Sequence, residues 1–310
     1  MVGKNYYRIM LGQKSKYAQE CIDGGFIGTD FNIAIDLTNQ LPDDWRRFRE
    51  ICAPAYFEVN PDKSKVAAGL ACGTIYTASK GILDGDIVLC PDGGGSYLVG
   101  EITGSYFYQA DQILPHRRPV TWYPKRIARS EMSESLRNST GSIGTLSNIS
   151  KHQDEIETLL SGNAPSPLGF TDPTIEDPSV FALEKHLEDF LVKNWQQTAL
   201  AERYDIFEED GDLVGQQYPT ETGPIDILAV SKDKKELLVV ELKKGRASDA
   251  VVGQIQRYMG FVLEDLAEEG QSVRGIIIAL DDDPRLRYAL KVASNIEFYR
   301  YQVSFKLVKG

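Results

Sequence analysis

Two apolar segments in the second half of the chain each carry a carboxylate in a run of residues that otherwise favours burial. Asp226 interrupts the apolar stretch 223–230, and Glu241 follows the apolar residues 237–240. A buried carboxylate is costly unless it is paired or binds a metal. Because side chains alternate across a strand, Glu241 and Lys243 share one face, and a hairpin of the two segments brings Asp226 beside Glu241.

These three side chains suit the hydrolysis of a phosphodiester. Mg²⁺ prefers oxygen ligands and keeps several of its waters, so Asp226 and Glu241 are the candidate metal ligands. A metal in that position can activate water and stabilise the charge that builds on a phosphate. Lys243 can orient the attacking water or neutralise the transition state. A Glu-x-Lys pair at a strand end is more often simply solvated, so the assignment depends on the surrounding pattern.

Asp226 followed by the triplet 241–243 (Glu-Leu-Lys) resembles the signature of the PD-(D/E)xK nucleases, with Pro224 one position earlier than usual. A predicted helix before it carries Glu184 and Glu188, which lie one turn apart on one face. The order of predicted elements also matches the αβββαβ core of that superfamily. The resemblance implies a restriction-endonuclease-like α/β domain in which Glu188, or alternatively Glu184, is the helical acidic residue.

The next predicted helix carries Gln254 and Tyr258, which resemble the QxxxY element of several nuclease branches. More narrowly, the stretch 188–262 is similar to the catalytic domain of the NucS/EndoMS endonucleases, on the segments 194–195, 215–219, 223–229, 240–246 and 253–259. The resemblance implies a Mg²⁺-dependent nuclease, with Mn²⁺ able to substitute, in which Lys243 is the catalytic lysine. It also implies that Gln254 contacts the scissile region and that Tyr258 supports the site.

Two further charged groups lie close to this set in the sequence. Lys244 and Arg246 are candidates for phosphate contact, although a solvated turn explains them about equally well. The acidic run 281–283 looks like a metal trap, but a cap for a helix that begins at Pro284 is the better explanation.

A basic stretch in the first half of the chain suggests nucleic-acid recognition. Residues 115–130 contain no acid and lie close to several aromatic residues, a mixture that suits phosphate contacts and base stacking. The candidate DNA-binding residues there are Arg117, Arg118, Trp122, Lys125 and Arg126. The alternative is that the aromatic residues are core and the arginines lie on a solvated face.

The first half also has a weaker family resemblance. Its segments 24–28, 85–88, 97–102 and 115–122 resemble PUA-like and EVE-like modules found ahead of some Mrr-type restriction nucleases. The resemblance implies a domain that holds an everted base.

A Gly-, Pro- and Ser-rich stretch at 161–169 indicates a linker between two domains. We predict a β-rich recognition domain over 1–160, a linker over 161–179 and a nuclease domain over 180–310. In the first domain we expect helices near 15–23, 43–51 and 150–160. In the second we expect a mixed central sheet flanked by helices, with strands and helices at the following positions: helix 180–200, strands 204–207, 213–218, 224–230 and 236–242, helix 248–267 with Ser248 as N-cap, strand 275–280, helix 284–293, and strands 297–301 and 303–308.

Composition excludes several classes of protein. No apolar run approaches the roughly 18 residues of a membrane span, and the first residues lack the apolar core of a signal peptide, so we expect a cytoplasmic protein without a membrane partner. Four cysteines without CxxC spacing and three histidines make structural zinc an unattractive hypothesis.

Residues 1–150 carry 16 Lys and Arg against 16 Asp and Glu, so the net charge of −11 falls on the second half. The chain should therefore bind random DNA weakly.

The favoured hypothesis is a Mg²⁺-dependent endonuclease of double-stranded DNA, of a restriction or antiviral-defence type. Its first domain would license cutting by recognising a modified base or a DNA structure, and cutting both strands would require a homodimer. A second hypothesis is a nuclease that is gated by a small nucleotide signal. A third is a mismatch-repair endonuclease, and a fourth is a catalytically inactive DNA-binding protein.

Overall fold

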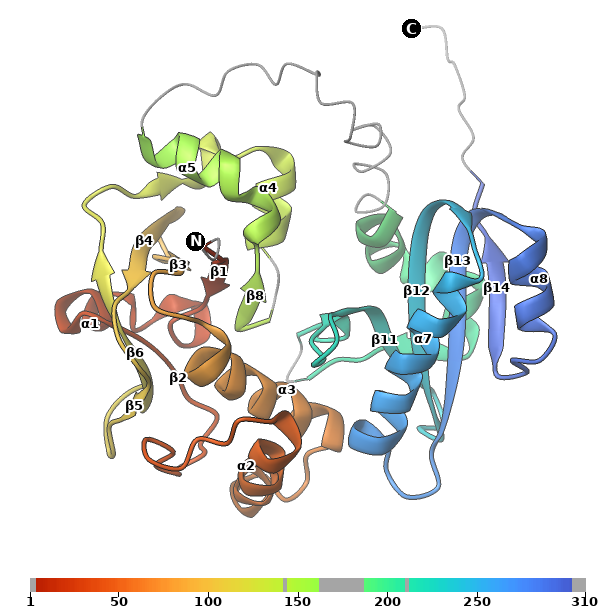
Figure 1. The fold of residues 1–310 in the computed structure, drawn as a ribbon, viewed down its shortest axis with the longest axis horizontal. Coiled ribbons are helices and arrows are strands. Elements are labelled where there is room, and N and C mark those ends of the chain that lie inside the picture. The colour runs from red at the N-terminus through yellow and green to blue at the C-terminus, as the bar shows by residue number, and fades with distance from the viewer. Residues whose placement is uncertain (1–3, 142–143, 162–186, 210–211, 303–310) are drawn as a thin grey trace, which may run out of the picture. The chain divides into compact units, whose positions relative to one another are not determined.

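The computed structural model describes residues 4–141, 144–161, 187–209 and 212–302 (Figure 1). The chain divides into two compact units, residues 1–63 with 67–171 and residues 64–66 with 172–310. The predicted linker 161–179 lies almost entirely outside the described residues. Within the described part, no helix is long and apolar enough to cross a membrane.

The amino-terminal unit is built on an eight-stranded sheet in which β2, β6, β4, β3, β1 and β8 follow one another, while β5 pairs with β6 and β7 with β4. Only the pairing of β1 with β3 is parallel. The strands are β1 (Tyr6–Ile9), β2 (Phe26–Thr29), β3 (Ile87–Pro91), β4 (Ser96–Ile102), β5 (Phe107–Tyr108), β6 (His116–Trp122), β7 (Ile127–Ala128) and β8 (Leu146–Asn148). This sheet confirms the β-rich expectation for the first half.

The helices in this half of the chain are α1 (Ala18–Gly24), α2 (Trp45–Val59), α3 (Lys65–Tyr76), α4 (Glu134–Thr140) and α5 (Gln153–Ser161). Three of them lie close to predicted positions. Helix α2 begins where Asp44 caps it, because the Asp44 side chain accepts the N–H of Arg47 at 3.0 Å. Helix α3 was not predicted, because its residues are apolar on every side and show no helical period.

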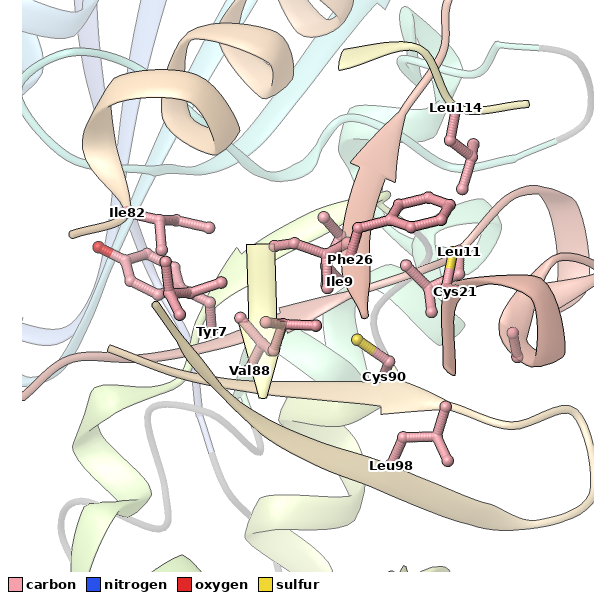
Figure 2. Close-up of a cluster of buried hydrophobic side chains, with 14 residues drawn as sticks. Tyr7, Ile9, Leu11, Cys21, Phe26, Ile82, Val88, Cys90, Leu98 and Leu114 are labelled. Atoms are coloured by element: carbon pink, nitrogen blue, oxygen red, sulfur yellow. The ribbon is translucent and has the colours of Figure 1, made fainter. Parts of the chain in front are cut away.

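The two faces of the amino-terminal sheet bury separate cores, which follows from the alternation of side chains along β1. Tyr7 and Ile9 enter one core, shown in Figure 2, and Tyr6 enters the other. The first core also holds Cys21 and Cys90. All four cysteines of the chain are buried with free thiols.

The carboxy-terminal unit contains a mixed six-stranded sheet in the order β10, β11, β12, β13 and β14, with β9 paired to β11. Strands β12, β13 and β14 are parallel, whereas β9, β10 and β12 run antiparallel to β11. The strands are β9 (Tyr204–Ile206), β10 (Gln216–Tyr218), β11 (Ile225–Ser231), β12 (Glu236–Ala247), β13 (Ser272–Asp282) and β14 (Ile296–Arg300). The mixed sheet confirms the predicted α/β class.

The carboxy-terminal helices lie at the predicted positions, but their ends differ from the predicted ones. Helix α7 (Ala250–Phe261) packs against β12 and β13 and continues into a π-helical turn, and α8 is Pro284–Leu290. Residues 187–193 are helical, whereas 180–186 and the predicted strand 303–308 lie outside the described residues.

The two predicted helix caps in this unit have opposite outcomes. Ser248 as N-cap of α7 is wrong, because Asp249 holds that position without a side-chain capping bond. Asp283 caps α8 as predicted, accepting the N–H of Leu286 at 2.7 Å.

Candidate active site

A tight turn fixes how β11 and β12 pair. The N–H of Lys234 donates to the Ser231 carbonyl at 2.7 Å, and Lys234 adopts a left-handed backbone with φ of 60°. The Ser231 hydroxyl accepts the N–H groups of Lys235 and Glu236 at 3.1 and 2.9 Å. A one-residue slip would turn every side chain to the other face, so this turn determines which residues reach the site.

The resulting register places Asp226 and Glu241 on neighbouring strands. Ile227 pairs with Val240, and one residue further the N–H of Leu242 donates to Asp226 Oδ2 at 2.7 Å. Asp226 is half-buried, whereas Glu241 is only 2% exposed. The hairpin therefore brings two carboxylates together at one end of the strand pair.

Lys243 lies on the same strand as Glu241, two residues further on. Its Nζ is 2.7 Å from Glu241 Oε1, so a buried carboxylate and a partly exposed ammonium form a hydrogen-bonded ion pair. The ladder between β12 and β13 shifts register between Lys243 and Arg246. Such irregularities redirect side chains, and they occur often beside active sites.

The two basic residues after Lys243 have different outcomes. Arg246 is exposed and forms an ion pair with Asp281 at 3.4 Å. The side chain of Lys244 lies outside the described residues.

Glu188 joins the site through two glutamines of β10 to which no motif in the sequence assigned a role. Glu188 is 7% exposed, and its Oε1 accepts a hydrogen bond from the Gln216 amide at 2.7 Å. Its Oε2 accepts one from the Gln217 amide at 2.6 Å, and the same amide donates to Asp226 Oδ1 at 3.2 Å. One feature of the sequence pointed to these glutamines, because both lie within 215–219, a segment that resembles the NucS/EndoMS catalytic domain. Glu184 lies outside the described residues.

Helix α7 brings Gln254 and Tyr258 to the carboxylates. Burial raises the pKa of Tyr258, the charges of Glu241 and Asp226 act in the same direction, and a hydrogen bond with Gln254 opposes them. The backbone also approaches this phenol, because a Cβ on Gly223 would lie 3.1 Å from Tyr258 Oη. Gly223 has φ of 122°, which other residues rarely adopt.

The donor set of Asp226 and Glu241 fits a divalent cation. Mg²⁺ is commonly bound through one or two carboxylates and retains water at its other positions. Among the described residues, no group of three or more His, Cys, Asp or Glu side chains is arranged to hold a metal. Asp226 and Glu241 are the candidate ligands because of their donor chemistry and their places on neighbouring strands.

The acidic run 281–283 is occupied by other interactions. Asp281 pairs with Arg246, Asp282 forms an ion pair with Arg287, and Asp283 caps α8. These contacts agree with the structural role that the sequence favoured for the run.

The structure corrects the expectation that Arg118 contacts DNA. Arg118 is 5% exposed, and its guanidinium donates to the carbonyls of Gly104 at 2.7 Å and Ser79 at 3.2 Å and to Asp84 at 2.9 Å. These acceptors hold the group in the interior of the unit, where a phosphate does not reach it.

The other four amino-terminal candidates differ in exposure. Arg117 is half-buried over the Phe26 ring and donates to backbone carbonyls, and Trp122 packs against the first core, with its indole N–H bonded to a carbonyl. Lys125 and Arg126 are exposed, and Arg126 pairs with Asp92 at 3.0 Å. Lys125 and Arg126 are therefore the two candidates that solvent reaches freely.

Comparison with known proteins gives different results for the two halves. Residues 192–304 match the family model of the endonuclease NucS C-terminal domain, and residues 7–150 match a domain of unknown function, DUF8426. Endonuclease NucS of Methanocaldococcus jannaschii is 24% identical over 208 residues, which cover 67% of this chain and 70% of that protein. Endonuclease NucS of Corynebacterium aurimucosum is 32% identical over 114 residues, 36% of this chain and 44% of that protein.

Two solved structures also align. One is described as an EndoMS–dsDNA2 complex, with 13% identity and a TM-score of 0.33, covering 68% of this chain and 62% of that one. The other is a repair endonuclease from Pyrococcus abyssi, with 17% identity and a TM-score of 0.31, covering 68% of this chain and 66% of that one. Over residues 192–304, the carboxy-terminal unit is therefore similar to the C-terminal domain of endonuclease NucS.

Proposed function

We propose, from the premise of a carboxy-terminal NucS-type nuclease domain, that this chain is a divalent-metal-dependent DNA endonuclease. The observation that carries the proposal is the arrangement of Asp226 and Glu241 on neighbouring strands, with Lys243 Nζ 2.7 Å from Glu241 Oε1. The curated relatives named endonuclease NucS support the same activity.

Each residue of the site has a proposed role. Asp226 and Glu241 would hold the cation, Mg²⁺ with Mn²⁺ as a substitute, which when bound supplies an activated water and stabilises charge on the phosphate. Lys243 adds a fixed positive charge on the same face and orients the attacking water. Gln254 contacts the scissile region and Tyr258 supports it. The expected products carry a 3′-hydroxyl and a 5′-phosphate.

Substitution of the central residues tests this proposal. We expect Asp226→Asn and Lys243→Met to lower the rate of plasmid cleavage with Mg²⁺ by about 10²-fold or more, because each removes a charge that acts on the transition state. Lys232→Met, at an exposed position near the β11–β12 turn, is the matched control and should cut normally. Thermal unfolding of all three variants confirms that they fold. If Asp226→Asn and Lys243→Met cleave the plasmid at the wild-type rate, the proposal is refuted.

We further propose that the amino-terminal unit licenses cutting, by recognising a modified base or a DNA structure, in a restriction or defence role. The favouring observation is that residues 7–150 match a family model distinct from that of the NucS domain. A mismatch-repair role is the second candidate and is compatible with the NucS relatives.

Cleavage of matched substrates separates these roles. The chain is incubated with unmodified, base-modified or mismatched duplexes in the presence of Mg²⁺, Mn²⁺ or EDTA. Each reaction is run with and without added cyclic nucleotides. Cutting of modified duplexes alone supports the restriction role, and cutting of mismatched duplexes alone supports repair. Cutting that requires the nucleotide supports a gated effector, and binding without cutting indicates an inactive protein. Sedimentation of the full chain tests the proposed homodimer.

A further inference from the structure

We infer that Glu188 and Gln217 are positioning residues, and that Glu188 acts on Asp226 through the Gln217 amide rather than as a metal ligand. The inference rests on the proposed function, because it concerns the cation that Asp226 and Glu241 would hold. It assigns Gln217 a role that the sequence pattern does not indicate.

The Asp226 carboxylate is held at both of its oxygens. The N–H of Leu242 donates to Oδ2 at 2.7 Å from the neighbouring strand. The Gln217 amide donates to Oδ1 at 3.2 Å from the strand on the other side. Two donors from opposite sides fix the plane of the carboxylate, so its orientation toward a cation depends on where Gln217 is held.

Glu188 holds Gln217 in place. Its Oε2 lies 2.6 Å from the Gln217 amide nitrogen, whereas Asp226 Oδ1 lies 3.2 Å from the same nitrogen. Its Oε1 accepts a hydrogen bond from the Gln216 amide at 2.7 Å. Hydrogen bonds to an ionised carboxylate are stronger than those between neutral groups. Because Glu188 is 7% exposed and both of its oxygens accept amides, it serves as an anchor for the two glutamines.

The backbone explains how two consecutive glutamines reach one carboxylate. Successive side chains of a regular strand point to opposite faces, so Gln216 and Gln217 should diverge. Gln217 instead has φ of 51°, in the left-handed region that side-chain-bearing residues seldom adopt. This departure turns both amides toward Glu188, and unusual backbone of this kind is concentrated at functional sites.

A double-mutant cycle on the full chain tests the inference. Gln217→Met and Glu188→Met keep side-chain length but remove the polar groups, and Gln256→Met on the exposed face of α7 is the matched control. Mn²⁺ binding is measured by isothermal titration calorimetry. The Mg²⁺ concentration for half-maximal cleavage is measured separately.

We expect each single variant to weaken Mn²⁺ binding about tenfold, as loss of a group that orients a metal ligand commonly does. The double variant should be no weaker than the worse single variant, because both changes break one connection. At saturating Mg²⁺ the maximal cleavage rate should stay within a few-fold of wild type. Gln256→Met should match wild type throughout.

Three results would overturn the inference. The first is additive losses in the double variant, and the second is normal Mn²⁺ binding by Glu188→Met combined with loss of cleavage at saturating metal. The third is absence of Mn²⁺ binding by the wild-type chain. If Glu188→Met does not fold, the isosteric Glu188→Gln takes its place. A wild-type chain that binds Mn²⁺ but does not cut DNA would refute the proposed function, while the binding cycle still decides this inference.

Discussion

Gly223 shows how closely single residues are constrained at the site. It combines a φ of 122° with a Cβ position only 3.1 Å from Tyr258 Oη, so both its backbone and its surroundings exclude a side chain. Tyr258 in turn is 5% exposed and lies within the electrostatic reach of Glu241, Asp226 and Lys243. A change at Gly223 should therefore affect stability and the position of Tyr258 together.

We expect Gly223→Ala to destabilise the chain by about 1–3 kcal/mol, because alanine is strained at positive φ and its methyl group displaces the Tyr258 phenol. Cleavage should fall as well. Gly253→Ala is the matched control, because Gly253 lies in α7 with no atom within 4 Å of an added Cβ. That control should be neutral or stabilising by up to ~1 kcal/mol. Urea unfolding with a cleavage assay checks both, and equal stability of the two variants would contradict the expectation.

At the scale of elements, most of the nuclease unit could be predicted from apolar patterning, because β11, β12, β13 and α7 have strong periods or apolar runs. The details that failed depend on tertiary contacts. No pattern distinguishes Asp249 from Ser248 as the N-cap of α7, and nothing local extends β12 through a register shift to Ala247. The Glu188–Gln217 connection depends on a left-handed backbone angle, which the residue type glutamine does not indicate.

In the amino-terminal unit, the sequence indicated strands better than it indicated exposure. Residue type alone suggested that Arg117 and Arg118 face solvent, but backbone carbonyl groups bind both guanidiniums. The Arg117 guanidinium donates to carbonyls three and four residues earlier in the chain, whereas Arg118 donates to the more distant carbonyls of Gly104 and Ser79. Helix α3 was missed for the complementary reason, since a helix that is apolar on every side has no amphipathic period.

Glu236 connects several strands of the carboxy-terminal sheet. It begins β12 and accepts hydrogen bonds from Tyr204 on β9 and from Ser272 and Arg274 on β13. Burial acts to raise the pKa of Glu236, but the Tyr204 hydrogen bond and the Arg274 charge outweigh it and leave the pKa below its ordinary value. The ionised form therefore stabilises the folded state above the unfolded pKa, and this contribution is lost as the pH falls through the folded pKa.

We expect Glu236→Gln to lower the free energy of unfolding at pH 7 by an amount on the order of 1 kcal/mol. The difference from wild type should shrink as the pH falls below about 4.3, the ordinary pKa of glutamate. Glu269→Gln, at an exposed position, is the control. Thermal or urea unfolding at a series of pH values measures the effect, and a pH-independent difference would contradict it.

For the whole molecule, the distribution of charge bears on how DNA is bound. The formal net charge of −11 belongs to residues 151–310, which include the candidate nuclease site, whereas residues 1–150 are neutral overall. Attraction between basic side chains and phosphates supplies most non-specific DNA affinity. We therefore expect DNA binding by this chain to depend on the cation proposed for its site and on recognition of particular DNA features.

We expect the full chain in EDTA to bind an unmodified duplex with a Kd weaker than about 10⁻⁶ M at physiological salt. Fluorescence anisotropy measures this affinity, and it should strengthen at low salt. Lys125→Met with Arg126→Met should weaken the residual binding, whereas Glu20→Gln, at an exposed position of the same unit, should not. Tight binding of an unmodified duplex at physiological salt would contradict this account.

The burial of all four cysteines has a practical consequence for studying the molecule in solution. Burial raises the pKa of Cys21 to about 12, and it holds the pKa of Cys90 well above its ordinary value. Thiol-directed reagents react with exposed thiolates, so the native cysteines remain unmodified while the chain is folded. One cysteine introduced at Val292, which is 89% exposed, would then be the sole attachment point for a fluorophore or spin label. With a second cysteine introduced at an exposed position of the other half, a pair of labels could report the separation of the two halves with and without DNA, with every native thiol retained.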